Sequence, residues 1–548
     1  MNKQLVKQSE MKALRPFVHL HTHTEYSLSD GIAKIEALVD KAMADGMPGL
    51  AITDHANMFG VREFVEYVES RNRELGTSFK PIIGCEVYVA RRGKDKQDER
   101  DDWGGHHLIL LAKNYTGYKN LVKLVSKSWL EGYYGRPRTD KADLERYHEG
   151  LICCSACIGG EVAQHILNGY LNEAEKAAKW YQSIFGEDYY LELQRHKATA
   201  ERANHETYKL EEKANSQLRK IAKKLGIKLV CANDIHFVDE EDAEVQDALL
   251  CINWGRLYDD PNRLIFSKQE WLKTTAEMNE LFGDIPEALK STIEIFNKVE
   301  HYSINDEPQI PNPTLPEGID EVEYLARLAF EGAYERFGKP LSAGIKERLK
   351  AELRVINSHR YAPLVLMWHE IVSAARNLGA KMGKDRGFAK SSLLLYTLGI
   401  TQNRPVEFGE AFCNYINHKQ GLPALELEFD KEGRERVLKW IVERYNEQSV
   451  ANIVSRNVFT AKTAATSGIR AEKLVGVLRK LDIHSCGVAI CEGDISRRIP
   501  LAWVESEKNE NAVIVTQYGG NALRRIGVGE LYILTSNTLH DDSAEMAE

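Results

Sequence analysis

The sequence lacks long apolar runs, dense groups of cysteines and internal repeats. No uninterrupted apolar stretch is long enough to span a bilayer, and residues 1–8 contain no apolar core of a signal peptide. The nine cysteines are scattered along 548 residues, which is typical of reduced thiols rather than of a disulfide framework. These absences predict a cytoplasmic protein with no membrane partner.

Excess positive charge is also missing. The net charge of −9 argues against a protein that binds duplex nucleic acid over its whole surface, because phosphate binding needs concentrated Lys and Arg. A local basic cleft is still compatible with this net charge. An apolar fraction of 43% and a charged fraction of 28% are ordinary for globular proteins, and the length allows about two to four domains. Eleven of the 17 histidines precede residue 237, so we expect the chemistry in the N-terminal part.

A histidine-rich stretch near the start, residues 18–31, is predicted to be a strand. On an extended backbone alternate side chains share a face, so His21 and His23 point the same way and form a pair of metal ligands. Clustered imidazoles repel one another once protonated and leave ring nitrogens unsatisfied when buried, so such a cluster calls for a reason. The alternative is a set of exposed histidines on an edge strand.

Short apolar segments then alternate with helical patterns through residue 236. This alternation predicts parallel strands joined by right-handed crossovers, closing into an α/β barrel. The predicted strands are residues 49–55, 81–89, 106–112, 151–157, 189–193 and 228–236, and the predicted helices include residues 32–44 and 61–75.

Residues that can bind metal lie on or beside these strands. Imidazole, thiolate and carboxylate together suit a site for several zinc, manganese or iron ions, and such a site activates water against a phosphoester. Taken alone, Cys157 reads as a small buried side chain and Asp30 as part of a turn, so the joint pattern carries the argument. The set is His21, His23, Asp30, His55, Glu86, His107, Cys157, Asp234 and His236.

Successive motifs in this region resemble the polymerase and histidinol phosphatase (PHP) domain family. The motifs are His21-Thr22-His23, Ser29-Asp30-Gly31, Thr53-Asp54-His55, Gly84-Cys85-Glu86, residues 107–112 and Asn233-Asp234-Ile235-His236. Residues 117–122 and 263–266 resemble the version found at the N-terminus of bacterial DNA polymerase III alpha subunits, which are C-family polymerases.

The resemblance implies a distorted α/β barrel that holds three divalent metal ions. It places His21, His23, Glu86 and Asp234 at the first ion, with Glu86 shared with a second ion held by His107 and Cys157. It places Asp30, His55 and His236 at the third. The first four are the expected catalytic ligands, whereas His19 and His106 are expected to be structural or to support the ligands.

Residues 361–540 resemble the palm domain of the same subunits, but in truncated and degenerate form. The triphosphate loop at residues 383–392 contains Arg386 and Gly387 and carries Phe388 and Lys390 in place of small residues. Residues 423–429, with Ala424, Glu426 and Glu428, stand where the family has an aspartate strand, and Tyr532 stands at the third aspartate.

These replacements predict a catalytically inactive palm. Two-metal phosphoryl transfer needs carboxylates placed within a fraction of an ångström, and the extra methylene of Glu426 and Glu428 displaces each carboxylate. Glu530 is a conceivable substitute, although its side chain is expected to crowd Tyr532 on the same strand face. A residual polymerase that uses these glutamates therefore stays an alternative.

The sequence divides into four predicted parts. Residues 1–275 form the PHP domain, residues 276–360 a helical connector, residues 361–540 the degenerate α+β palm, and residues 541–548 an acidic tail.

The expected function is that of a metal-dependent phosphoesterase, most specifically a 3′ to 5′ DNA exonuclease, beside an inactivated polymerase site. DNA ends and a replication protein are the expected partners. The alternatives are a non-catalytic DNA-binding or replisome-binding scaffold, a residual DNA polymerase, and a phosphoesterase acting on RNA ends or small phosphoesters.

Overall fold

The computed structural model describes residues 14–402, 404–405, 416, 421–465, 471–506 and 509–536. It divides into two compact units. The barrel unit comprises Met1–Tyr302 with Arg456–Leu481, and the second unit comprises Ser303–Ser455 with Asp482–Glu548. The predicted acidic tail at residues 541–548 lies outside the described residues.

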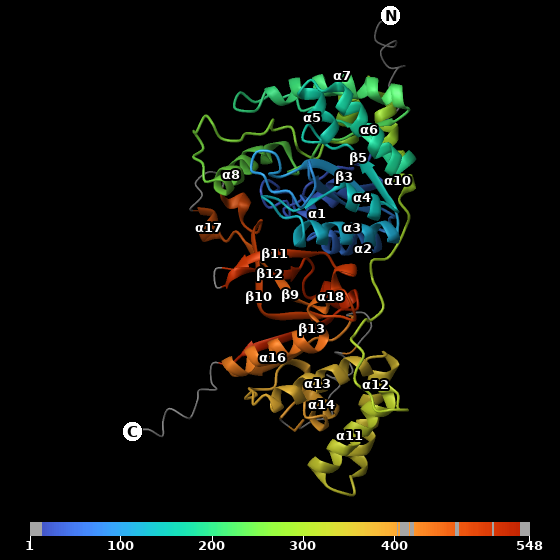
Figure 1. The fold of residues 1–548 in the computed structure, drawn as a ribbon, viewed down its shortest axis with the longest axis vertical. Coiled ribbons are helices and arrows are strands. Elements are labelled where there is room, and N and C mark those ends of the chain that lie inside the picture. The colour runs from blue at the N-terminus through green and yellow to red at the C-terminus, as the bar shows by residue number, and fades with distance from the viewer. Residues whose placement is uncertain are drawn as a thin grey trace, which may run out of the picture. The chain divides into compact units, whose positions relative to one another are not determined.

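Strands and helices alternate along the barrel unit, as the sequence predicts (Figure 1). The helix over Val61–Leu75 and the strand over His106–Ala112 have the predicted bounds. The strands are β1 (Gly49–Ile52), β2 (Lys80–Val89), β3 (His106–Ala112), β4 (Arg138–Thr139), β5 (Leu151–Cys154), β6 (Tyr189–Leu193) and β7 (Lys228–Cys231). The helices are α1 (Ile35–Ala44), α2 (Val61–Leu75), α3 (Tyr115–Leu130), α4 (Lys141–Tyr147), α5 (Glu161–Leu167), α6 (Leu171–Phe185), α7 (Glu206–Leu225), α8 (Ala243–Trp254), α9 (Thr275–Leu281), α10 (Pro286–Lys298) and α17 (Ala461–Ala465).

The sheet of the barrel unit follows the order β1-β2-β3-β5-β6-β7, with β4 paired to β2. β1 pairs with β2, β5 with β6 and β6 with β7 in parallel, whereas β3 is antiparallel to both β2 and β5. The prediction of all-parallel pairing is therefore wrong at β3. No helix separates β2 from β3, so the chain returns beside β2 through the loop that ends near Gly105 and runs in the opposite direction.

The histidine-rich segment joins the two edges of this sheet. The amides of Ala51 and Thr53 donate to the carbonyls of His19 and Thr22, and the His23 amide donates to the Ile235 carbonyl at 2.7 Å. The predicted strand at residues 18–31 is wrong in extent, because only Thr22 forms a bridge, to Ile235, and residues 25–30 turn. The segment nevertheless connects the ends of β1 and β7 and so nearly closes the barrel.

Alternate side chains of the strands form the barrel core. Ile82 of β2, Ile109 and Leu111 of β3, Tyr190 of β6 and Val230 of β7 belong to one buried cluster. Glu86 and His107 have the same parity as the core residues of their strands, so the strand pattern aims their side chains to the same face. Helices cover the outside of the sheet; for example, α3 packs on β3 and α10 on β7.

The second unit is an α+β arrangement around a six-stranded sheet of order β11-β12-β9-β10-β13-β8. The strands of this sheet are β8 (Leu425–Phe429), β9 (Val450–Val458), β10 (Leu478–Ile490), β11 (Leu501–Ser506), β12 (Asn509–Thr516) and β13 (Gly529–Thr535), of which the end of β9 and the start of β10 fall in the residues 456–481 counted with the barrel unit. The helices of the second unit are α11 (Glu321–Phe337), α12 (Ala343–Ser358), α13 (Ala362–Asn377), α14 (Leu393–Thr397), α16 (Lys431–Tyr445) and α18 (Asn521–Arg525). β8 lies within residues 423–429, the segment that the resemblance places at the aspartate strand of the family.

The predicted domain boundaries at 275/276 and 360/361 stay predictions. The compact barrel unit continues to Tyr302 because α10, which the prediction assigns to the connector, packs against β7. Within the described residues, no helix is both long and apolar enough to cross a membrane. The eight cysteines of the described ranges are all free thiols.

Candidate metal centre

The nine predicted ligands lie on or near strand ends at one rim of the barrel. His55 follows β1, Cys157 follows β5, and Asp234 and His236 follow β7, whereas His107 lies at the start of β3. His107 reaches the same rim because β3 runs antiparallel to β2. The backbone leaves three of these strands through non-glycine residues with positive φ, Ala56 (47°), Ala156 (61°) and Asp234 (45°), a conformation that is tolerated where the surroundings enforce it.

One cluster combines His21, His23, Glu86 and Asp234. Ligand atoms of these four side chains lie within 4.8 Å of one another. His21 Nε2 is 3.1 Å from His23 Nε2, 3.0 Å from Glu86 Oε2 and 3.0 Å from Asp234 Oδ1. The two histidines of the opening segment therefore point the same way, as predicted.

A second cluster shares Glu86 and adds His107 and Cys157. His107 Nδ1 lies 2.8 Å from Glu86 Oε1 and 3.5 Å from Cys157 Sγ. Gly159 allows this approach, because a Cβ there would be 3.0 Å from the His107 ring. Glu86 thus presents one carboxylate oxygen to each of the two clusters.

The third group contains His55, His236 and Asp30. His55 Nε2 is 3.2 Å from Asp30 Oδ1, and His236 Nε2 is 3.8 Å from the same oxygen. His23, His55 and His236 also converge within 4.8 Å as a set of possible ligands. His23 consequently lies between the first and third groups.

Partners behind the imidazoles determine which ring nitrogens face the centre. His21 Nδ1 lies 2.7 Å from Glu192 Oε1, so this nitrogen donates to the carboxylate and Nε2 faces the centre. His23 Nδ1 contacts Ser27 Oγ at 2.9 Å, and Ser27 Oγ donates to Asp54 at 2.7 Å, so His23 Nδ1 is again the donor. Glu192, Ser27 and the structural role of Asp54 were not predicted.

The sequence does indicate that the Glu192 side chain points into the barrel. It lies on the predicted strand at residues 189–193, two residues after Tyr190, which is a core residue. Alternation along that strand places both side chains on the inner face, and a carboxylate on an inner face needs a partner.

Electrostatics keep the carboxylates of the centre ionised. Burial alone would raise the pKa of Glu86, but His107 and His55 outweigh it and hold that pKa well below its usual range. Burial likewise opposes ionisation of Asp234, and His21 holds its pKa well below the ordinary value. For the Cys157 thiol the balance is reversed, because burial and the nearby Asp234 and Glu86 carboxylates raise its pKa by more than His21 lowers it.

The donor set fits divalent cations. Nε2 of His21 and Nε2 of His23 lie 3.1 Å apart, so a proton or a metal ion has to lie between or beside them. Among the described residues, Asp30 Oδ1 and Asp234 Oδ1 are buried without an aligned hydrogen-bond donor, although histidine nitrogens lie 3.0 to 3.8 Å away. A bound cation would satisfy both features.

His19 and His106 lie outside the three groups. His19 Nε2 contacts the Lys273 carbonyl at 2.7 Å, and burial lowers the pKa of this histidine to about 4. Burial also lowers the pKa of His106 to about 4. Both rings are therefore neutral at physiological pH.

The predicted degenerate polymerase positions lie together in the second unit. β8 pairs in parallel with β13, which places Glu426 opposite Tyr532 and brings Glu428 to the same region of the sheet. Arg386 forms an ion pair with Glu428 at 2.7 Å, and the Gly383 amide donates to the Glu428 carbonyl at 2.7 Å. Gly387 has a positive φ of 56°, and Ala424 is buried just before β8.

Glu530 is fully buried beside Tyr532. The Tyr532 hydroxyl donates to Glu530 Oε1, and Arg524 Nε donates to Glu530 Oε2 at 2.7 Å. The predicted crowding of the two side chains thus takes the form of a hydrogen bond. Both oxygens of this carboxylate have protein partners, whereas Glu426 is exposed on β8.

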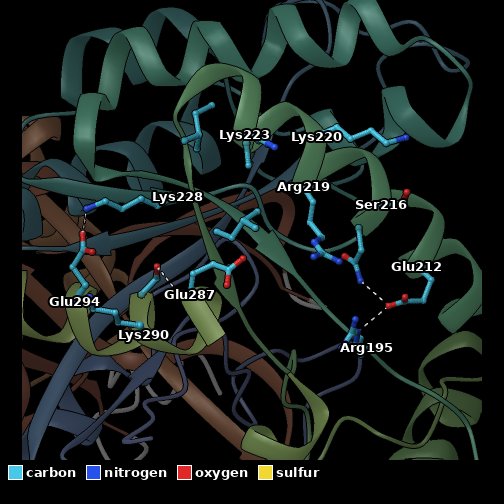
Figure 2. A pocket seen from close by; sticks show the side chains of 15 residues that line it. Arg195, Glu212, Ser216, Arg219, Lys220, Lys223, Lys228, Glu287, Lys290 and Glu294 are labelled. Carbon is cyan, nitrogen blue, oxygen red and sulfur yellow. Dashed lines mark hydrogen bonds and ion pairs between the residues drawn. The ribbon is translucent and has the colours of Figure 1, made fainter. Parts of the chain in front are cut away.

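A cavity of about 790 Å³ lies elsewhere on the barrel unit, between α7, the start of β7 and α10 (Figure 2). Its walls carry Arg195, Arg219, Lys220, Lys228 and Lys290, and Figure 2 shows Arg195 paired with Glu212 and Lys228 paired with Glu294. None of the nine predicted ligands lines it. The candidate chemistry therefore lies at the barrel rim and not in this cavity.

Two parts of this chain match known protein families. Residues 19–196 match the PHP domain, and residues 323–471 match the family described as the bacterial DNA polymerase III alpha NTPase domain. The match to a solved putative metal-dependent phosphoesterase from Bifidobacterium adolescentis covers 40% of this chain and 87% of that one at 15% identity, with a TM-score of 0.23.

The curated relatives are subunits of one kind. DNA polymerase III subunit alpha of Borreliella burgdorferi is 40% identical over 449 residues, which cover 80% of this chain and 37% of that protein. The Campylobacter jejuni subunit is 29% identical over 612 residues, covering 95% of this chain and 49% of that protein. The chain spans about two fifths to half the length of these relatives. It contains a PHP domain followed by a bacterial DNA polymerase III alpha domain, and it is related in sequence to the bacterial DNA polymerase III alpha subunits.

Proposed function

We propose that the barrel is a metal-dependent phosphoesterase that removes nucleotides from the 3′ ends of DNA. The observation that carries this proposal is the convergence of nine metal-competent side chains at one rim, in overlapping groups that share Glu86 and His23. Overlapping ligand groups with bridging carboxylates suit adjacent cations, which clamp a phosphate and activate water. The similarity to DNA polymerase III alpha subunits supports DNA as the substrate.

The residues divide into three ligand sets under this proposal. His21, His23, Glu86 and Asp234 would hold one divalent ion, with Glu86 shared with a second ion at His107 and Cys157. Asp30, His55 and His236 would hold the third. Zinc, manganese or iron ions bound there would polarise a phosphate oxygen and lower the pKa of a bound water.

The protein's own groups orient this set. Glu192 holds the His21 ring from behind, and Ser27 does the same for His23, so both rings keep Nε2 toward the centre. His236 Nδ1 lies 2.7 Å from the Asp234 carbonyl, which leaves its Nε2 facing Asp30. The ligands therefore do not have to reorganise when substrate arrives.

The polymerase site is inactive under the same proposal. Support comes from Glu428, whose carboxylate is paired with Arg386, and from Glu530, whose two oxygens are taken by Tyr532 and Arg524. Only Glu426 of these acids faces solvent, and a lone carboxylate does not assemble a two-metal site. A cytoplasmic location, with DNA and a replication protein as partners, completes the proposal.

Purified full-length protein tests the hydrolase. We expect it to shorten 3′ ends of end-labelled single-stranded and double-stranded DNA in manganese, and His21→Ala or Asp234→Ala to abolish the reaction. His205→Ala, a change at an exposed histidine, is the matched control and should keep full activity. Metal analysis of the same samples should show less bound metal in the two ligand variants.

Parallel labelling of the 5′ and 3′ ends gives the polarity. Undiminished hydrolysis in both purified ligand variants would refute the assignment of the barrel. Primer extension with correct nucleotides by the unmodified protein would refute the inactive polymerase site.

A further inference from the structure

A group of aromatic and arginine side chains lies beside the proposed metal centre and takes no part in it. Tyr88 of β2 is buried, and its ring centroid is 5.0 Å from that of His107 and 6.0 Å from that of His55. Arg136 lies next to this tyrosine, with its Nη1 2.8 Å from the Tyr88 hydroxyl and its guanidinium carbon 5.0 Å from the ring centroid. Tyr88 thus connects Arg136 to two proposed ligands.

Arg136 has no carboxylate within ion-pair distance among the described residues, and its side chain is partly exposed. Arginine binds phosphate oxygens with its planar fork of N–H donors, and such a guanidinium is free to do so. Its position next to the ligands of a proposed phosphoesterase makes a phosphate the matching anion.

Two large aromatic rings near Arg136 are open to solvent. Trp103 is 57% exposed and Tyr133 is 50% exposed. Trp103 contacts the Tyr134 ring edge-on at 5.5 Å and lies over Gly135, where an added Cβ would be 2.5 Å from the indole. Tyr133 stacks on Trp129, whose indole N–H donates at 2.7 Å to the carbonyl of Ala56, the residue after His55.

Arg138 fixes the loops that carry these rings. It is fully buried, and it donates to the carbonyls of Gly132 and Asp102 at 2.9 and 2.6 Å and to those of Lys94 and Lys96 at 2.9 and 3.0 Å. A buried arginine that bridges two surface loops holds both in one conformation. Exposed rings that are held in place lose little entropy when a flat group stacks on them.

We propose that Arg136, Trp103 and Tyr133 form a binding subsite for single-stranded nucleic acid beside the metal centre. Arg136 binds a backbone phosphate, and the two exposed rings stack on unpaired bases. The subsite rests on the proposed phosphoesterase function and narrows its substrate to a strand end rather than a small phosphoester. A paired base inside a duplex cannot offer its face to these rings, so the preference is for single strands.

Fluorescence anisotropy of a labelled oligodeoxythymidylate tests the subsite directly. The binding is measured in the full chain with Asp234→Ala, which prevents hydrolysis. We expect Trp103→Ala and Tyr133→Ala each to raise the Kd about fivefold or more, the loss typical of one stacked base. Arg136→Ala should raise the Kd about tenfold, as expected for a charged hydrogen bond to phosphate.

Salt dependence separates the two kinds of contact. Removal of one phosphate contact lowers the slope of log K against log salt by about 0.7, whereas removal of a stacked ring leaves the slope unchanged. Tyr170→Ala, at a ring that is 62% exposed, and Arg219→Ala, in the cavity of Figure 2, are the matched controls and should leave the Kd within about twofold. Trp103→Phe keeps a ring and should bind as the parent does.

The outcomes distinguish the subsite from the proposed function. An unchanged Kd in Arg136→Ala, Trp103→Ala and Tyr133→Ala would overturn the subsite, even where the unmodified protein hydrolyses DNA. Weaker binding in these variants, with unaltered melting temperatures, would support the subsite even where no hydrolysis occurs. Hydrolysis of bis(p-nitrophenyl) phosphate should be unaffected by Trp103→Ala, and an equal loss on this small substrate would also count against stacking.

Discussion

Buried carboxylates occur in two regions of the chain that the sequence connects with phosphoryl chemistry, and their partners differ. At the barrel rim, Asp30, Glu86 and Asp234 face imidazole nitrogens. In the second unit, Glu428 faces Arg386, and Glu530 faces Arg524 and Tyr532. An imidazole can exchange a proton for a metal ion, whereas a guanidinium is always charged and cannot become a ligand.

Under the proposed function, this difference separates a site that metal ions can complete from one whose buried carboxylates already have protein partners. Arg524 and Tyr532 satisfy Glu530 permanently, so its carboxylate serves the stability of β13. Asp30 and Asp234 each keep a buried oxygen without an aligned donor, a condition that the fold tolerates where a cation completes the site. The kind of residue that contacts a buried carboxylate therefore indicates the role of that carboxylate better than its presence alone does.

The largest expected effect comes from exchanging one acid in each region. Asp30→Asn should lower DNA hydrolysis more than about 100-fold, because it removes a proposed metal ligand. This loss is larger than the one that follows substitution of a residue that only contacts a ligand. Glu426→Gln should leave hydrolysis unchanged. End-labelled DNA assays on both purified variants, with melting temperatures as the folding control, make the measurement. Equal activities in the two variants would remove the distinction between the regions.

For stability, in contrast to hydrolysis, we expect the larger effect from an acid of the second unit. Glu530→Gln is expected to destabilise the second unit by about 3 kcal/mol, because it leaves Arg524 beside a buried neutral group. Hydrogen exchange at the amides of β13 would report this loss without interference from the barrel unit. Glu428→Gln is the matched control, since Arg386 is 44% exposed and such a pair contributes less than about 1 kcal/mol. Similar losses in both variants would contradict the structural role of Glu530.

A third ion pair, between His196 and Glu211, predicts a pH-dependent effect inside the barrel unit. His196 Nδ1 lies 2.6 Å from Glu211 Oε1, and its Nε2 lies 2.9 Å from the Asn233 carbonyl, so both nitrogens donate. Burial opposes the charge, but Glu211 outweighs it and raises the pKa of His196 to about 9. The stabilisation is present below the unfolded pKa of about 6.5 and is lost as pH rises through about 9.

A pKa that rises from 6.5 to about 9 on folding corresponds to an expected contribution of about 3 kcal/mol to stability. Urea unfolding of the protein and of His196→Gln at pH 6 and pH 10 should show the difference between them shrinking at the higher pH. A difference that is the same at both pH values would show that His196 is neutral in the folded state.

The sequence was sufficient to predict most of the rim and much of the barrel. Strand alternation and short spacings such as His21-Thr22-His23 are local properties, so they identify inward-facing side chains without knowledge of pairing. The antiparallel course of β3 is different, because it depends on which neighbour a strand finds. His107 was assigned to the rim correctly, although its strand runs in the unexpected direction.

Contacts between residues distant in the sequence could not be predicted, although the inward direction of the Glu192 side chain follows from its strand. Glu192 lies 171 residues from His21, and Arg386 lies 42 residues from Glu428. Nothing in the local pattern around these residues specifies the contact, because the contact depends on how the strands are ordered in the sheet. The packing of α10 against β7, which extends the compact barrel unit to Tyr302, has the same origin.

The smallest expected effect tests one of these distant contacts. Glu192 accepts from His21 Nδ1 at 2.7 Å and from Gln194 Nε2 at 2.8 Å, and its charge makes His21 Nε2 a better ligand. Glu192→Gln should therefore weaken zinc or manganese binding about 10- to 100-fold, measured by competition with a chromogenic chelator. Glu206→Gln, at an exposed position on α7, is the control and should bind metal as the parent does. An unchanged affinity in Glu192→Gln would mean that backbone geometry alone orients His21. The carboxylates of the barrel would then differ from those of the second unit in the residues that they contact, but not in any effect on a metal ligand.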